Sequence, residues 1–441
     1  MRVRDLAPAR SGSIIGRMWT PRKASVLPLP ACPPFCWPVG YPVPSNILRR
    51  VTQEGRIGRA KRPLQHSVGE EDTALQRRIE WQKIKIDSEA FESACVFDVD
   101  GDGIPDIVCG GYWYRGPDWT KHKLCDVRAE GEYYDDFSTI PMDVNGDGYT
   151  DFVTGGWWGQ TLVWRENPGP AGGEWKTHEI AVVGSIETTR AWDVDGDGEL
   201  EIVPNTPGNP LRVFKLERDA SGRPAGRFRE FVISPEPQGH GLGFGDIAGD
   251  GTMALVTPGG WWEAPKGDPL KGEWKFHPEF DLGTVSVPIL VEDVNGDGVP
   301  EIVAGQAHGY GLDYWTQQPG PDGCRIWTRH PVDPWFSQYH EMLWVDVDGD
   351  GCCELLTGNR YRAHCGKEPG ETDIVGLFYF KWNGESFTKC VIDYGKVGEH
   401  SGTGIFMWAG DIDGDGRLDI VAPGKEGLFL FRNLGPERAG E

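Results

Sequence analysis

The sequence predicts an all-β fold, a seven-bladed β-propeller of four-stranded blades, and three observations lead to it. An acidic, glycine-containing motif recurs seven times along the chain, at intervals of 45 to 65 residues. Each copy precedes a short apolar or β-branched run, such as "DIVCGG" or "DFVTGG", which is typical of a strand that ends in a turn. The chain also contains 62 glycines and 19 tryptophans, which suit many short strands and turns. Repeats of this period that each build one small sheet are typical of propellers.

A second repeat lies between the acidic motifs and predicts an outer strand in each blade. In four units an aromatic residue is followed three positions later by histidine, at Trp119/His122, Trp175/His178, Trp274/His277 and Trp327/His330. Metal binding is one reading of these histidines. Recurrence at the same place in the repeat favours a structural role instead, in which each histidine packs at an equivalent point of the scaffold.

The ends of the chain predict how the ring closes. No aromatic-x-x-His unit follows the last acidic motif, whereas Trp81, in "EWQKIKI", precedes the first motif without a partner upstream. A strand at 81–86 would complete the last blade and leave no sheet edge unpaired. The propeller is therefore expected to span residues 79–435, with 436–441 as a tail.

The charge of the chain is divided between its two parts. Residues 1–78 hold 14 Lys and Arg against five Asp and Glu, and the other 30 basic and 62 acidic residues give the remainder a formal charge of −32. The basic, Pro-rich segment 1–78 is expected to be disordered or to follow a start site placed too far upstream. The acidic remainder argues against nucleic acid as a partner and in favour of bound cations. No apolar run is long enough for a membrane span.

The first acidic motif shows why calcium is the expected cation. Asp98, Asp100, Asp102 and Asp106 hold positions one, three, five and nine, and Gly103 at position six permits a sharp turn. Hard oxygen ligands in this number suit Ca²⁺ better than Mg²⁺ or zinc. An EF-hand would need a Glu at position twelve and a following helix, whereas a strand follows here.

Six of the seven motifs are complete, so about six structural calcium sites are expected. The other five complete sets are Asp143, Asn145, Asp147 and Asp151; Asp193, Asp195, Asp197 and Glu201; Asp293, Asn295, Asp297 and Glu301; Asp346, Asp348, Asp350 and Glu354; and Asp411, Asp413, Asp415 and Asp419. The fourth motif keeps Asp246 and Asp250 but has alanine at two ligand positions, so no tight site is expected there. Calcium binding favours a periplasmic or secreted location, while the lack of a clear signal peptide leaves a cytoplasmic one open.

The motifs "DVDGDGIPDIVCGG" and "DIDGDGRLDIVAPG" resemble FG-GAP or VCBS repeats of calcium-binding propellers. The resemblance covers about four-fifths of the chain. It implies the propeller fold and calcium in the loops, but such propellers include adhesins, binding modules and lyases, so it does not imply one function.

A second group of polar residues is expected on the face opposite the acidic loops. Glu187, His240 and His340 each stand six residues before an acidic motif, where inner strands begin and converge on the ring axis. His308 and His364 follow second strands and so open on the same face. Other residues expected nearby are His400, Asp135, Asp136, Tyr310, Arg360, Tyr361 and Arg362. Histidines with a carboxylate are the usual ligands of catalytic zinc or a similar divalent ion, although a polar lining of a wet channel is the alternative.

Aromatic residues are expected in turns on that face and could stack on sugar rings. They are Trp157, Trp158, Trp261, Trp262, Tyr112 and Trp113. The alternative is that one ring of each pair packs between blades.

The segments "GHGLGFGD", "GQAHGYGLDYW", "SQYHEM" and "NRYRAH" also resemble the propeller domain of aldos-2-ulose dehydratase-type proteins. The resemblance implies a metal-assisted loss of water from a keto-sugar, with His240, His308, His340, His364, Glu187 and Tyr310 as catalytic candidates. Arg360, Tyr361 and the tryptophan pairs would bind the sugar. Those enzymes carry further domains that this sequence lacks, which leaves a non-catalytic glycan- or protein-binding propeller as the alternative.

Overall fold

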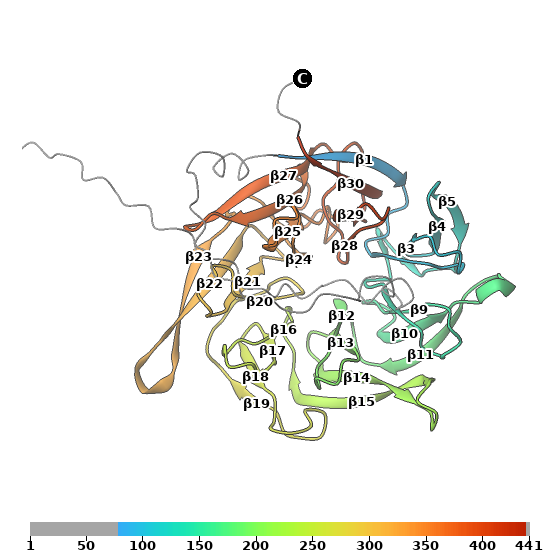
Figure 1. The fold of residues 1–441 in the computed structure, drawn as a ribbon. Helices are drawn as coiled ribbons and strands as arrows, with labels where there is room; N and C mark the ends of the chain where they lie inside the picture. Colours follow the sequence, from blue (N-terminus) through green and yellow to red (C-terminus); the bar gives the residue numbers. More distant parts are fainter. Residues whose placement is uncertain (1–77, 438–441) are drawn as a thin grey trace, which may run out of the picture. The chain divides into compact units, whose positions relative to one another are not determined.

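The structure is a computed structural model of the chain and describes residues 78–437. Seven antiparallel four-stranded sheets follow one another around a ring (Figure 1), which confirms the predicted seven-bladed propeller. The expectations for residues 1–77 and 438–441 lie outside the described residues. No helix of the described part is long and apolar enough to cross a membrane.

Each of the first six blades is built from four consecutive strands. Blades one to three contain β2 (Ala94–Phe97), β3 (Asp106–Cys109), β4 (Tyr112–Arg115) and β5 (Thr120–Lys123); β8 (Ile140–Met142), β9 (Asp151–Thr154), β10 (Thr161–Glu166) and β11 (Lys176–Val182); and β12 (Thr188–Trp192), β13 (Glu201–Asn205), β14 (Pro210–Arg218) and β15 (Pro224–Pro237). Blades four to six contain β16 (Gly243–Gly245), β17 (Ala254–Thr257), β18 (Gly260–Glu263) and β19 (Lys275–His277); β20 (Leu290–Glu292), β21 (Glu301–Gly305), β22 (Leu312–Pro319) and β23 (Arg325–Pro331); and β24 (Met342–Val345), β25 (Glu354–Gly358), β26 (Val375–Trp382) and β27 (Phe387–Gly395). A small hairpin of β6 (Ala129–Glu130) and β7 (Tyr133–Tyr134) joins blades one and two.

The seventh blade joins the two ends of the described chain. Its strands are β28 (Trp408–Gly410), β29 (Asp419–Ala422), β30 (Leu428–Pro436) and β1 (Ile79–Asp87). β1 pairs antiparallel with β30, with Trp81 opposite Asn433, and the blue and red strands lie side by side in Figure 1. The prediction that the N-terminal strand completes the last blade is confirmed.

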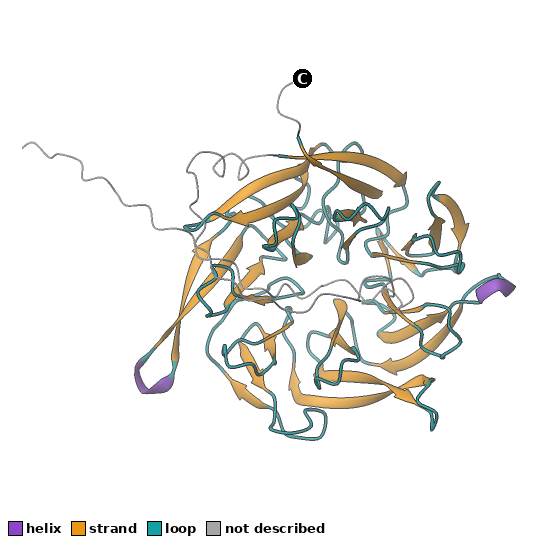
Figure 2. Ribbon diagram, in the orientation of Figure 1, coloured by secondary structure: helices purple, strands orange, loops and turns teal. Residues whose placement is uncertain are grey.

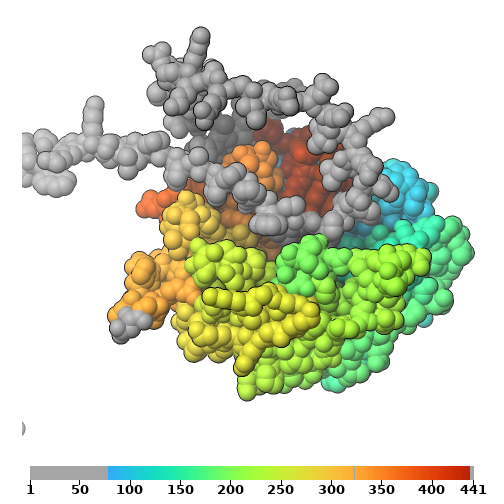
Figure 3. Space-filling view, turned by 60° about the horizontal axis from the view of Figure 1, so that its bottom comes forward, coloured from blue at the N-terminus to red at the C-terminus, as the bar shows by residue number. Residues whose placement is uncertain are grey.

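The hydrophobic core consists of clusters between adjacent blades. In one of them Val203 of blade three packs with Leu255 of blade four, and equivalent clusters fill the other blade interfaces of the described residues. The second strands are buried at every position, as in "DIVC" of β3, because both faces of each sheet are covered. The green and yellow blades accordingly form one continuous surface in Figure 3.

The repeated histidines of the outer strands have the structural role that their recurrence predicts. His122 stacks on Trp113, His178 on Trp164 and His277 on Trp261, with ring centroids 4.4, 4.3 and 4.1 Å apart. His330 stacks on Tyr314 in the same way. Two short 3₁₀ helices, η2 (Gly169–Ala171) and η3 (Pro321–Gly323), lie in the outer hairpins of blades two and five (Figure 2).

The acidic motifs form loops between the inner and second strands of each blade. In loop one the Asp98 carboxylate accepts hydrogen bonds from the backbone N–H groups of Gly101 and Gly103, at 2.8 and 2.9 Å. Gly103 has a φ of 83°, which glycine adopts without strain. The carboxylate at position nine, Asp106, is fully buried and accepts from the N–H of Val99. All these loops lie on one face, so the connections that enter the inner strands lie on the other.

Candidate functional site

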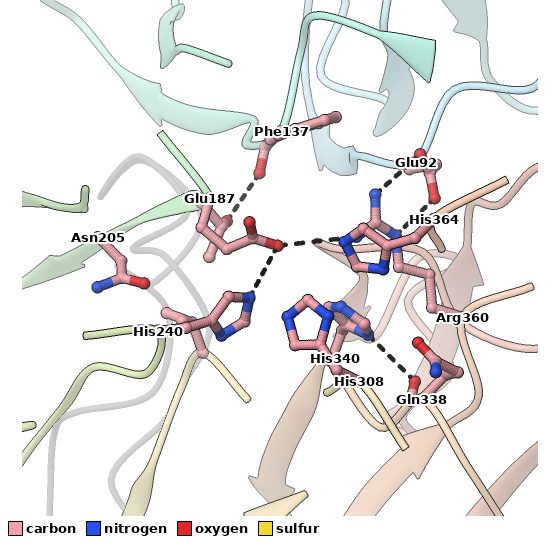
Figure 4. Close-up of polar contacts among 12 residues, drawn as sticks. Glu92, Phe137, Glu187, Asn205, His240, His308, Gln338, His340, Arg360 and His364 are labelled. Atoms are coloured by element: carbon pink, nitrogen blue, oxygen red, sulfur yellow. Dashed lines mark hydrogen bonds and ion pairs between the residues drawn. The ribbon is translucent and has the colours of Figure 1, made fainter. Parts of the chain in front are cut away.

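The axial face opposite the acidic loops brings together four histidines and a glutamate from four blades. Glu187, His240 and His340 stand one, three and two residues before the inner strands β12, β16 and β24. His308 and His364 follow the second strands β21 and β25. Figure 4 shows their side chains directed toward a common centre, and the rings of His240 and His308 lie 4.6 Å apart. The structure therefore places these residues as the spacing predicted, and their function stays a prediction.

Hydrogen bonds fix which nitrogen of three imidazoles faces the centre. Nδ1 of His240 donates to the carbonyl oxygen of Val285 at 2.8 Å, and Nδ1 of His340 donates to that of Gln338 at 3.3 Å. Nδ1 of His308 lies 2.8 Å from the Glu368 carboxylate. Because these oxygens are acceptors, Nδ1 carries a proton in each ring, and Nε2 of His308 and His340 can keep its lone pair, whereas Nε2 of His240 faces the Glu187 carboxylate at 3.2 Å. This arrangement is typical of metal-binding histidines.

The free donor atoms of the cluster fit a divalent cation. His240, His308 and His340 each offer one ring nitrogen, and these three nitrogen atoms lie within 4.8 Å of one another. Nε2 of His240, Nε2 of His340 and Oε1 of Glu187 are buried without a hydrogen-bond partner, although His240 Nε2 and Glu187 Oε1 are only 3.2 Å apart. Burying unsatisfied polar atoms costs free energy, so these atoms need a ligand that accepts their lone pairs.

Three members of the cluster have protonation states that suit a cation, whereas the Glu187 carboxylate outweighs burial and raises the pKa of His240. Burial raises the pKa of Glu187, but the neighbouring His240 and Arg360 overcome this and hold it at about 2, so the group is a carboxylate. Burial, followed by the positive charge of Arg360, lowers the pKa of His340 well below its usual value. The same two causes lower the pKa of His364. Both imidazoles are therefore neutral near pH 7 and can donate lone pairs.

A buried ion-pair network supports the cluster from blades one, six and seven. The Arg360 guanidinium donates to Glu92 from Nε at 2.7 Å and from Nη2 at 3.1 Å, and its Nη1 lies 3.7 Å from Glu187 Oε1. Lys425 also donates to Glu92, at 2.9 Å. Glu92 was missed from sequence, yet it stands six residues before Asp98, the same spacing that identified Glu187, His240 and His340.

The segment between β25 and β26, residues 359–374, contacts the histidine cluster and is called the flap here. Within it, Glu368 lies 2.9 Å from His364 Nδ1 and also contacts His308. At its margins Arg362 pairs with Glu132 at 2.5 Å, and Asp373 accepts from the Tyr310 hydroxyl at 2.6 Å. Glu368 was missed from sequence, and its place four residues after His364 is the only signal that could have found it.

Three residues expected near the histidines are engaged elsewhere. His400 lies 2.7 Å from Asp393 and next to Lys83 of β1. The Asp135 carboxylate accepts from the backbone N–H groups of Trp158 and Gly159 and closes that turn. The buried Asp136 accepts from Thr154. Their roles are local and structural.

The aromatic residues divide into two groups. Trp157 and Trp158 lie in the turn after β9, as expected, with Trp157 exposed and Trp158 packed on Tyr133. The prediction of a turn is wrong for Trp261 and Trp262, which lie in strand β18, and likewise for Tyr112 and Trp113 in β4. Trp261 is buried against His277, because the second strand of blade four reverses after only two residues. Tyr361 is half-buried in the flap.

Comparison with known proteins supports the repeat family. A family model described as the FG-GAP-like repeat matches residues 143–203, which contain acidic loops two and three and the strands between them. The chain is thus a seven-bladed propeller in which residues 143–203 are similar to the FG-GAP-like repeat. No curated protein matches the chain.

Solved structures give similarity at the level of the fold. One is a lectin of Agrocybe aegerita, described as specifically recognising non-reducing terminal N-acetylglucosamine, with a TM-score of 0.41 and 17% identity over 68% of this chain and 80% of that one. Another is BBS1N in complex with ARL6DN, soaked with mercury, with a TM-score of 0.48 and 11% identity over 82% of this chain and 98% of that one. These similarities carry no argument about activity.

Proposed function

We propose that the axial cluster is a divalent-metal centre and that the chain is a metal-assisted carbohydrate lyase or dehydratase acting on a keto-sugar. His240, His308 and His340 would hold the ion through Nε2, with Glu187 as the carboxylate ligand. One observation supports the proposal: three imidazoles have Nδ1 bound to oxygen acceptors, Nε2 of His340 is buried without a partner, and Nε2 of His240 and Oε1 of Glu187 are buried with only each other at 3.2 Å. Zinc, manganese or iron would suit this donor set.

The residues around the centre can supply the remaining chemistry of an elimination. A bound ion would polarise the sugar carbonyl as a Lewis acid. His364 is neutral and half-buried, so it can accept the proton from the adjacent carbon. The Arg360 guanidinium can donate hydrogen bonds to substrate oxygens near Glu187. Tyr310 stays protonated, because its hydrogen bond to Asp373 raises its pKa, and its oxygen can accept a hydrogen bond at the rim.

Elemental analysis of the purified, desalted chain tests the metal centre directly. We expect about one transition-metal ion per chain, lost in His240→Ala and His340→Ala. His178→Ala is the matched control, because this histidine stacks on Trp164 in an outer strand. If the wild type carries calcium alone, or if the axial variants retain the transition metal, the metal centre is refuted.

A separate assay tests the reaction. Loss of water next to a carbonyl gives a conjugated product that absorbs ultraviolet light, so a panel of keto-sugars can be screened by absorbance. We expect His364→Ala to lower kcat by about 10²- to 10⁴-fold while the metal stays bound. If the metal is bound but no keto-sugar is turned over, the metal centre stands and the proposed lyase activity is refuted.

A glycan-binding propeller is the second candidate, and the exposure of Trp157 favours it. Trp157 is 38% exposed in the turn after β9, where its ring could stack on a sugar. This candidate predicts calcium but no transition metal, and glycan binding that is lost in Trp157→Ala and retained in His340→Ala.

A further inference from the structure

One position of the third strand decides what faces each acidic loop. In blade three Ile202 of β13 pairs with Phe214 of β14, so the next residue, Lys215, lies beside the position-nine carboxylate of Glu201. The corresponding residue is Arg115 in blade one, Glu166 in two, Glu263 in four, Thr316 in five, Lys381 in six and Arg432 in seven. Only blades three and six have lysine there.

Both lysines insert their ammonium groups among the carboxylates that calcium was expected to use. Lys215 Nζ lies 2.6 Å from Asp195, 2.7 Å from Asp197 and 2.9 Å from Glu201, which are positions three, five and nine of loop three.

Lys381 repeats this geometry in loop six. Its Nζ contacts Asp348, lies 2.7 Å from Asp350 and lies 3.2 Å from Glu354. Both lysines follow a phenylalanine, Phe214 in blade three and Phe380 in blade six, and both reach carboxylates at positions three, five and nine of their loops.

An ammonium group so placed excludes a calcium ion. Calcium binds oxygen ligands at about 2.3–2.6 Å, so it would need the volume that Nζ occupies between the same three carboxylates. The remaining ligand of loop three, Asp193, accepts from the backbone N–H groups of Asp197 and Gly198 at 3.0 and 2.9 Å. Most carboxylate oxygens of loop three are therefore paired with the chain's own donors, whereas Oδ1 of Asp195 is buried without a hydrogen-bond partner.

Arginine in blades one and seven does not achieve the same result. Arg115 contacts Asp100 and Asp102 but makes no ion pair with Asp106, and it is largely exposed. Arg432 reaches only Asp413, at 3.7 Å. Among the described residues, no basic side chain forms an ion pair with the carboxylates of loops two and five.

We propose that Lys215 and Lys381 are the permanent cations of acidic loops three and six. These two loops bind no calcium in the wild type. Removal of either lysine creates a divalent-cation site in that loop, with one Asp or Glu oxygen as the ligand at each ligand position. The inference concerns the face opposite the histidine cluster and does not rest on the proposed function.

Calcium titration of the full chain tests the proposal. After removal of bound ions with a chelator, calcium chloride is titrated calorimetrically into the wild type, Lys215→Met, Lys381→Met and the control Lys275→Met. Lys275 is an exposed lysine of an outer strand and lies 3.8 Å from the nearest carboxylate. We expect each loop variant, but not the control, to bind one calcium ion more than the wild type and to gain more in Tm from calcium.

An equal calcium stoichiometry in the wild type and in both folded loop variants would overturn the proposal. Should the methionine variants fail to fold, wild-type crystals grown with calcium give an independent answer by anomalous diffraction. We expect no calcium peak in loops three and six. A peak there, with the lysine displaced, would overturn the proposal equally.

Discussion

At the scale of single residues, a carboxylate on the flap determines how His308 faces the axis. Glu368 lies 2.8 Å from His308 Nδ1 and 2.9 Å from His364 Nδ1, so one side chain orients two imidazoles from different blades. A partner of this kind raises the basicity of the ligand nitrogen and fixes the ring. In the proposed metal centre, Glu368 would act by positioning His308.

Glu368→Gln is expected to weaken axial metal binding by about 10- to 100-fold, because the amide supports the imidazole less strongly than the carboxylate. Competition with a chelator of known affinity measures the change. Glu385→Gln is the control, since Glu385 is exposed in the turn between β26 and β27. Unchanged affinity in Glu368→Gln would remove the positioning role.

Glu426 makes the stability of the axial region depend on pH. Burial raises its pKa to about 8, although Gly402 donates a backbone hydrogen bond to Oε1, and its Oε2 has no partner. In the unfolded chain a glutamate titrates near pH 4. Between these values only the unfolded state releases the proton, so the free energy of unfolding falls as pH rises from about 4 to about 8.

Glu426→Gln imitates the protonated side chain and removes this dependence. We compare the free energy of unfolding of the variant with that of the wild type at pH 5 and at pH 8. The difference, variant minus wild type, is expected to be larger at pH 8 by at least about 1.4 kcal/mol, the equivalent of one pKa unit. Denaturant unfolding at the two pH values measures it, with Glu385→Gln as the exposed control. A pH-independent difference would contradict the assignment.

At the scale of elements, the ring depends on a strand that comes from the opposite end of the described chain. β1 covers the edge of β30, and its apolar residues pack into two clusters, with Ile79 and Trp81 in one and Ile84 and Ile86 in the other. Without β1, blade seven would expose an unpaired edge and both of these contacts.

A chain that begins at Ser88 is therefore expected to lose several kcal/mol of stability and to associate through the open edge. A chain that begins at Arg78 keeps every described strand and serves as the control. Scanning calorimetry and size-exclusion chromatography compare the two. Equal Tm values and monomeric behaviour of both would show that β1 does not close the ring.

At the scale of the whole molecule, the acidic loops are seven repeats that the structure makes unequal. Loops three and six hold lysines, loop four has alanine at two ligand positions, and loops two and five have no basic partner among residues 78–437. Calcium should therefore stabilise the propeller through fewer loops than the repeat count alone suggests. Since adjacent blades share hydrophobic clusters, calcium binding in a few loops should stabilise the whole ring.

We expect Tm to rise with the logarithm of free calcium and to fall on chelation. One site at 100 times its Kd contributes about 2.7 kcal/mol. Asp297→Asn should reduce the rise, whereas Asp250→Asn in the incomplete fourth loop should leave it unchanged. A Tm that does not change with calcium concentration would contradict calcium binding by any loop.

Much of the candidate site was predictable because the repeat itself carries geometry. The spacing of six residues before each acidic loop placed Glu187, His240 and His340 at the axis, and the position after a second strand placed His308 and His364 there. His400 failed because its segment folds back toward Asp393, a contact that no repeat spacing encodes. Trp261 and Trp262 failed because a two-residue turn extends β18 over both of them.

The sequence by itself determined the number of blades, the closing strand and the face on which the histidines gather, since these follow from the order and period of repeated elements. Only the tertiary structure decided which nitrogen of each histidine is free, that Arg360 pairs with Glu92 across 268 positions, and that lysines fill two acidic loops. Repeats fix where a residue lies on the backbone. The direction and the partners of a side chain depend on neighbours from other blades, and those are known only when the ring is closed.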